Sequence, residues 1–300
     1  MVWDSCNIIF NRNGHIFYTG DLVTGTVVLE FKRKKHVEYI DFKIIGISKA
    51  SWSRASPTLP YIKLYSQKSK IFDVTIDIFR DINGIKVNPG MCTYPFDFIL
   101  PPHAPSSFKS SVATVKYFIQ ITSKTSCNMS RTKIFPMCVL SKINVNHFEE
   151  YKVPTLFELS KTLWSTGSIS VFFKTYRGFT FEQRLPFEVI ISNEKRVIIS
   201  KIRVTLIQKR NYTVTSGHYD DEKAVCKVIH TEFTNERNET CKLFMDVPWI
   251  SPTSLNVTDA MINISYVLRV EICFLFHLTL HKDIPVIIST IPVLHYPFAT

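Results

Sequence analysis

The chain has 300 residues, 45% of them hydrophobic, which excludes a wholly disordered protein and leaves room for two domains with separate cores. It holds 36 Lys and Arg against 25 Asp and Glu, a formal net charge of +11, and residues 1–150 carry 19 of those cations against 11 of the acids. An excess of this size favours anionic partners, such as phosphorylated tails, acidic lipid headgroups or nucleic acid.

Apolar and polar residues alternate in both halves of the chain, which is typical of sheets with one packed face. The apolar positions of the first half are Ile40, Phe42 and Ile44, then Val74, Ile76 and Ile78, then Val115, Tyr117, Ile119 and Ile121. Those of the second half are Ile202, Val204 and Leu206, then Ile262, Ile264, Tyr266, Leu268, Val270 and Ile272. Residues 156–164 fit a short helix, and a strand or coil equally well.

Strand-like patterning lapses once, near the middle of the chain. We therefore predict an all-β protein of two tandem immunoglobulin-like sandwiches. The first covers residues 1–146, a linker covers 147–154, and the second covers 155–300.

Several motifs occur in one order across both halves. The run Tyr18-Thr19-Gly20-Asp21 leads into an apolar strand, and Pro95-Phe96-Asp97-Phe98-Ile99-Leu100-Pro101 is followed by Pro105-Ser106-Ser107-Phe108. Later motifs include Arg177-Gly178-Phe179, Leu185-Pro186-Phe187 and Ser265-Tyr266-Val267-Leu268. In this order the chain resembles the α-arrestins, the arrestin domain-containing proteins.

The resemblance implies two arrestin-type sandwiches without enzymatic activity or a cofactor. It implies an adaptor that engages membrane receptors or transporters, phosphorylated or not, and anionic lipid headgroups during endocytic sorting and protein transport. The expected place is the cytoplasm, in peripheral association with the plasma membrane or endosomes. In keeping with this, the opening residues lack the basic and apolar stretches of a secretion signal, and the seven cysteines form no Cys-x-x-Cys pair.

The chain departs from the family pattern at two places. Residues 178–183 lack the turn glycine and proline that the family has there, and no Pro-Pro-x-Tyr motif occurs between residues 1 and 300. Recruitment of a ubiquitin ligase through that motif is therefore not expected. A ligase-independent adaptor and a competitor of longer relatives are both compatible with this sequence.

The run Lys32, Arg33, Lys34 and Lys35 lies between predicted strands 26–31 and 37–45, so we expect a cationic hairpin end that could bind phosphate. A solvated loop that only blunts the sheet edge explains the run as well. No acid occurs from residue 98 to 148, a segment that contains Lys109 and Lys116. If these lysines share a face with the run, the first domain presents one basic plate. By resemblance, Arg12 is near a phosphate-sensing position of the first strand.

A predicted loop begins at Trp52, includes Arg54 and ends at Tyr61. By resemblance it corresponds to a loop that contacts membrane cargo, and an ordinary long connection is the equal alternative.

Other classes of function have less support. His277 and His281 would converge on a metal only from a helix, whereas their neighbours predict strand, and no catalytic motif occurs, so no metal or catalytic residue is predicted. Five Asn-x-Ser/Thr sequons keep a secreted or cell-surface glycosylated binding protein as the alternative. The basic residues are not interleaved with aromatic ones, so nucleic acid is not an expected partner.

Overall fold

The structure is a computed structural model that describes residues 3–12, 14–55, 61–124, 130–163, 167–194, 197–234, 236–255, 260–275 and 277–298, without the side chains of 161–163 and 167–168. The chain divides into two compact units. The N-terminal unit comprises Met1–Ser141 with Thr213–His218 and Asn256–Met261, and the C-terminal unit comprises Lys142–Tyr212, Tyr219–Leu255 and Ile262–Thr300. The predicted linker, 147–154, contains a short helix, α1 (Glu149–Lys152).

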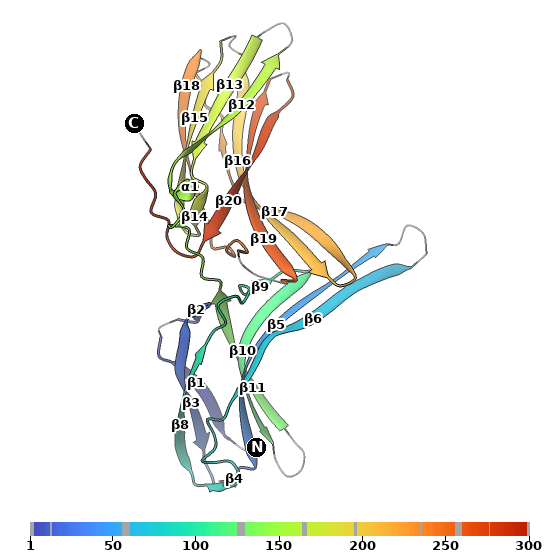
Figure 1. Cartoon of the computed structure of the whole chain (residues 1–300), viewed down its shortest axis with the longest axis vertical. Helices are drawn as coiled ribbons and strands as arrows, with labels where there is room; N and C mark the ends of the chain where they lie inside the picture. Colours follow the sequence, from blue (N-terminus) through green and yellow to red (C-terminus); the bar gives the residue numbers. More distant parts are fainter. Residues whose placement is uncertain are drawn as a thin grey trace. The chain divides into compact units, whose positions relative to one another are not determined.

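The N-terminal unit is a sandwich of two sheets (Figure 1). The first sheet has the order β1-β3-β8, formed by β1 (Ser5–Phe10), β3 (Leu22–Phe31) and β8 (Gly90–Ile99). The second has the order β2-β11-β10-β5-β6, formed by β2 (Ile16–Tyr18), β11 (Ser130–Leu140), β10 (Ala113–Lys124), β5 (Tyr39–Ala55) and β6 (Ile62–Ile76), with β9 (Phe108–Lys109) beside β10.

The core of this unit is built from the apolar positions that alternate along the strands. Phe42, Ile44, Tyr117 and Ile119 are buried, and the rings of Phe42 and Phe96 from facing sheets lie 5.0 Å apart. Val74 and Ile76 are only half-buried, because β6 is the edge of its sheet. The prediction of an all-β protein is confirmed.

The sequence predicted that the run from Lys32 to Lys35 forms the end of a hairpin. This prediction is wrong. β3 pairs with β1 and β8, whereas β5 pairs with β10 and β6, so the run crosses from one sheet to the other. Midway along this crossover, β4 (Lys35–His36) pairs with β7 (Lys86–Val87). Strands that follow each other in the sequence need not pair. Here both edges of β3 and both edges of β5 are occupied by other strands, so β3 and β5 do not pair with each other.

The C-terminal unit repeats this architecture. One sheet has the order β12-β13-β15-β18, formed by β12 (Thr155–Leu163), β13 (Gly167–Thr175), β15 (Arg184–Ser192) and β18 (Asn238–Asp246). The other has the order β14-β20-β19-β16-β17, formed by β14 (Gly178–Thr180), β20 (Leu280–Ser289), β19 (Ile262–Phe274), β16 (Ile199–Val214) and β17 (Gly217–His230). The segment that fitted a helix or a strand is the strand β12.

The two larger sheets match strand for strand. In each, a short early strand pairs in parallel with the last long strand, β2 with β11 and β14 with β20. The other pairs of these two sheets for which a register is known are antiparallel, and β10 and β19 hold equivalent places. The alternating sequence pattern predicts two sandwiches but not this repeated strand order.

Residues 290–298 follow β20 and pack on the segment before β12. Val293 forms a small apolar cluster with Ile143 and Val145, and the Tyr296 N–H donates to the Lys152 carbonyl at 3.0 Å. His295 stacks on Tyr176 with ring centroids 3.9 Å apart. The two segments therefore hold each other against the C-terminal unit.

The ring of His295 is held in its neutral form. Its Nε2 donates to the Gly178 carbonyl at 2.6 Å, which leaves Nδ1 to accept from the Gln183 amide at 3.3 Å. The Thr180 N–H occupies the Gln183 oxygen, so the amide turns its NH₂ to the ring. Burial lowers the pKa of His295, although the bond to the Gly178 carbonyl opposes that shift.

We expect the C-terminal unit to lose stability in mild acid because of this histidine. In the unfolded chain the ring takes up a proton near its ordinary pKa of 6.5, and the folded ring resists protonation to a lower pH. His295 therefore contributes its full stabilisation above pH 6.5, and this contribution declines as the pH falls through that value. Unfolding free energies of the wild type and of His295→Gln, measured near neutral pH and in mild acid, test this. Equal slopes for the two proteins would contradict it.

Candidate functional site

The crossover segment, residues 32–35, is fixed by one carboxylate. Asp4 Oδ2 accepts the Lys32 N–H at 2.8 Å and Lys35 Nζ at 2.8 Å. The backbone bond from Lys32, with the ammonium of Lys35, lowers the pKa of Asp4. Lys35 is thus half-buried and paired, whereas the side chains of Lys32, Arg33 and Lys34 are exposed. Three of the four predicted cations are available to an anion.

Lys109 and Lys116 belong to a different group, on the outer face of the larger sheet. Outer positions are those that alternate with the buried ones along each strand. Three lysines that the sequence analysis did not select lie on the same face. We call this group the lysine face, and its members are Lys49, Lys68, Lys70, Lys109 and Lys116.

Strand pairing arranges the lysine face in two rows. The first row passes from β9 to β6 through Lys109, Thr114, Lys49 and Lys68. The second row passes from β10 to β6 through Lys116, Ile47 and Lys70. Residues directly opposite in antiparallel strands have Cβ atoms roughly 5 Å apart, so Lys49 and Lys68 repel each other unless an anion lies between them.

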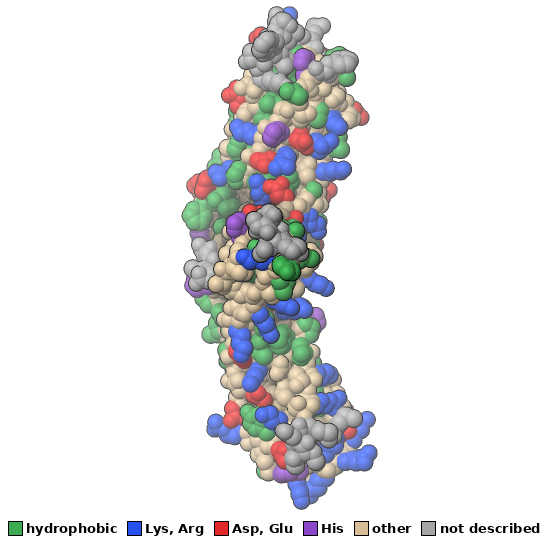
Figure 2. Space-filling view, turned by 90° about the vertical axis from the view of Figure 1, so that its right-hand side faces the viewer, with side chains coloured by type: hydrophobic (Ala, Val, Ile, Leu, Met, Phe, Trp, Pro, Cys, Tyr) green, Lys and Arg blue, Asp and Glu red, His purple; other side chains and the backbone are tan. Residues whose placement is uncertain are grey.

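Acidic partners lie at one margin of this face. Lys70 pairs with Asp73 at 2.6 Å, and Lys43, further along β5, pairs with Asp41 at 3.1 Å. Among the side chains that the structure describes, no Asp or Glu pairs with the other four members of the lysine face. Figure 2 shows Lys and Arg side chains distributed over the surface of the N-terminal unit, in the lower part of the view.

The two cationic groups do not form one plate. The crossover segment adjoins β4 and the lysine face adjoins β9, and these strands lie at opposite ends of the N-terminal unit (Figure 1). Asp41 and Asp73 lie on the outer face between them. The expected continuous patch is therefore wrong, and each group has to be tested separately. Arg12 belongs to neither, because it pairs with Asp21 at 3.0 Å beside the Tyr18 ring.

The predicted cargo-contacting loop divides into buried and exposed residues. Trp52 is only 8% exposed and stacks on Tyr65 with ring centroids 5.5 Å apart, so its selection as a contact residue is wrong. It is in phase with the inner positions of β5, which places it on the packed face. Arg54 is exposed, and Tyr61 is 70% exposed. Residues 56–60 lie outside the described part of the chain.

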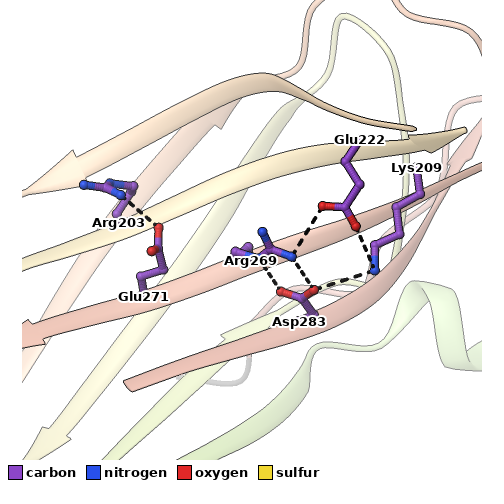
Figure 3. Close-up of polar contacts among 6 residues, drawn as sticks. All are labelled: Arg203, Lys209, Glu222, Arg269, Glu271 and Asp283. Carbon is purple, nitrogen blue, oxygen red and sulfur yellow. Dashed lines mark hydrogen bonds and ion pairs between the residues drawn. The ribbon is translucent and has the colours of Figure 1, made fainter. Parts of the chain in front are cut away.

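Charges on the outer face of the C-terminal unit neutralise one another instead (Figure 3). Arg269 binds both carboxylate oxygens of Asp283, at 2.8 and 2.9 Å, and Lys209 lies 3.6 Å from Glu222 and 3.7 Å from Asp283. The Arg269 guanidinium lowers the pKa of Asp283. Because the cations and carboxylates of this network neutralise one another, they favour one arrangement of the strands. They also leave little positive potential to attract an anion from solution.

The described part of the chain offers neither a metal centre nor a membrane-spanning helix. No three His, Cys, Asp or Glu side chains in those ranges are grouped to hold a metal ion. In the same part of the chain, no helix has both the length and the apolar character needed to cross a bilayer.

Comparison with known proteins agrees with the repeated sandwich. Residues 6–146 match the N-terminal domain of arrestin (or S-antigen), and residues 174–293 match its C-terminal domain. The chain therefore belongs to the arrestin family, whose members are generally non-enzymatic adaptors.

Within that family the chain is similar to arrestin domain-containing protein 1. The Rattus norvegicus protein is 26% identical over 191 residues, and the Mus musculus protein is 25% identical over 190 residues. Each alignment covers 61% of this chain and 43% of the relative. The chain thus matches less than half the length of these relatives.

Proposed function

We propose that this chain is a non-enzymatic adaptor that binds membrane receptors or transporters and delivers them to endocytic sorting. The proposal extends to anionic phosphate groups on cargo tails or lipids as the ligands of the N-terminal unit. It places the protein in the cytoplasm, in peripheral association with the plasma membrane or endosomes. The observation that carries it is the pair of arrestin domains, one after the other, over residues 6–146 and 174–293.

The charges of the two units support the N-terminal unit as the one that binds anionic phosphate groups. The exposed side chains of Lys32, Arg33 and Lys34 take part in no ion pair with any described residue. Phosphate oxygens accept charge-assisted hydrogen bonds from such side chains. Residues 1–300 contain no Pro-Pro-x-Tyr motif, so we propose that this part of the protein does not recruit a ligase by that route.

Proximity labelling in cells tests the adaptor function. The chain, fused to a labelling enzyme, should mark receptors or transporters above the level of the enzyme alone. Enrichment of ubiquitin ligases without membrane cargo would contradict the proposal.

The crossover segment makes a second, separable prediction. We expect the triple variant Lys32→Ser, Arg33→Ser and Lys34→Ser to bind a multiply phosphorylated cargo-tail peptide about tenfold more weakly. Fluorescence anisotropy measures this, and added salt should reduce the wild-type affinity because exposed charges are screened. The matched control replaces three exposed lysines of the C-terminal unit, Lys223, Lys227 and Lys242, by serine. Equal affinity of the two triple variants would remove the crossover segment from the site.

A further inference from the structure

Two exposed apolar side chains continue the line of the lysine face along β6. Ile62 is 74% exposed and Leu64 is 67% exposed. They alternate in phase with Ser66, Lys68 and Lys70, since pairing with β5 places Ile62 opposite Ala55 and Leu64 opposite Ser53 on the outer face. One face of one strand therefore changes from apolar to cationic.

The distances between the apolar and the cationic side chains suit binding to a lipid surface. A strand rises about 3.3 Å per residue, so Leu64 and Lys68 lie about 13 Å apart along β6. Across the sheet, the row from Lys109 to Lys68 extends over three strand spacings, roughly 14 Å. The cations thus cover an area instead of following a single line, and the apolar residues lie beyond its edge. Tyr61, also exposed, adjoins them.

We propose that the lysine face docks on an anionic lipid bilayer, with Ile62 and Leu64 entering the interface beside it. The inference rests on the proposed adaptor function and names the surface that would hold it at a membrane. Isolated apolar residues on a surface are ordinary. These two are different because they share a face with four cations that have no acidic partner among the described side chains. Phosphate-bearing headgroups neutralise such cations, and the acyl boundary removes the apolar side chains from water.

A phosphorylated peptide fits this face less well. A bound peptide follows one line, whereas the lysine face extends both along β6 and across the sheet, so a peptide would leave part of this face without an anion. It also offers no apolar layer for Ile62 and Leu64. The peptide remains a measurable outcome of the experiment below.

Co-sedimentation with vesicles tests the proposal on the full chain. Wild type should bind vesicles of phosphatidylserine in phosphatidylcholine and should bind pure phosphatidylcholine vesicles much more weakly. Replacing Lys49, Lys68, Lys109 and Lys116 by serine should weaken binding about fivefold for each lysine removed. The double variant Ile62→Ser and Leu64→Ser should weaken it about tenfold, and what binding remains should disappear at high salt.

A control pair exists on the other sheet of the same unit. Leu22 and Ile99 are opposite each other in β3 and β8 and are 57% and 64% exposed, so their replacement by serine removes similar apolar area. This control should bind like wild type. Equal losses in both double variants, or a lysine variant that binds vesicles normally, would overturn the proposal.

The outcomes also distinguish a failure of the bilayer-docking proposal from a failure of the proposed adaptor function. If wild type captures membrane cargo and phosphopeptide but no vesicles, the bilayer proposal is wrong and the adaptor function stands. If wild type binds vesicles as described but labels no cargo in cells, the adaptor function is wrong and the docking surface stands.

Discussion

Replacing Gly25 by valine is expected to lower the unfolding free energy of the N-terminal unit by about 3 kcal/mol. Gly25 lies within β3, opposite Phe10 and Phe96. A Cβ at this position would come within 2.8 Å of the Ile9 carbonyl oxygen and within 2.8 Å of the Phe96 ring. The oxygen belongs to the backbone of a paired strand and cannot turn aside. The ring already packs 5.0 Å from Phe42 in the facing sheet.

Urea denaturation of the purified chain measures the effect. Thr26→Val is the matched control. Thr26 is the residue after Gly25, lies on the opposite, outer face of β3, and already carries a branched side chain. We expect the control to change stability by less than about 0.5 kcal/mol. A Gly25→Val protein as stable as this control would show that β1 and β3 are not paired in the register described here.

Replacing Tyr266 by phenylalanine is expected to cost the C-terminal unit about 2 kcal/mol. The hydroxyl is buried, accepts the Gln208 amide at 2.6 Å and donates to the Ser251 carbonyl at 2.5 Å. Burial raises the pKa of Tyr266, so the group stays protonated as a donor. Phenylalanine fills the same space but leaves the buried Gln208 donor and a carbonyl without their partner.

The N-terminal unit provides the comparison. Tyr117, at the equivalent place in β10, donates to the Pro105 carbonyl at 2.5 Å, and the structure describes no second bond to its hydroxyl. Tyr117→Phe should therefore cost about 1 kcal/mol, less than Tyr266→Phe. Calorimetry of both variants decides the order. A larger loss for Tyr117→Phe would mean that the amide of Gln208 finds another acceptor or water.

The strands could be predicted because their signal is local. The whole face from Ile262 to Ile272 is buried as the alternation indicated, since a period of two needs no knowledge of the partner strand. Trp52 could have been placed correctly by the same rule. It is in phase with Ala50, a buried residue, but its nearness to a predicted loop suggested exposure.

The candidate site depended on partners that lie far away in the sequence. Lys35 is neutralised by Asp4, and nothing near residue 35 indicates that contact. Lys49 and Lys68 become neighbours only through the register of β5 and β6, which shifts by one residue between Gly46 and Ile47. A shift of this kind follows from packing and turn geometry, and so the lysine face could not be read from charge alone.

The parallel pairs at the edge of each larger sheet affect how the protein is made. Ile16 pairs with Cys138, and Gly178 pairs with Ile287, so in both sandwiches an early strand waits for the last one before it finds its partner. During translation, each module can close only when nearly all of it has left the ribosome, and contacts of such long range form slowly. Until then, β2 and β14 lack their partners, and the edges of β10 and β19 that β11 and β20 will cover stay open, so nascent chains are most prone to associate at that stage.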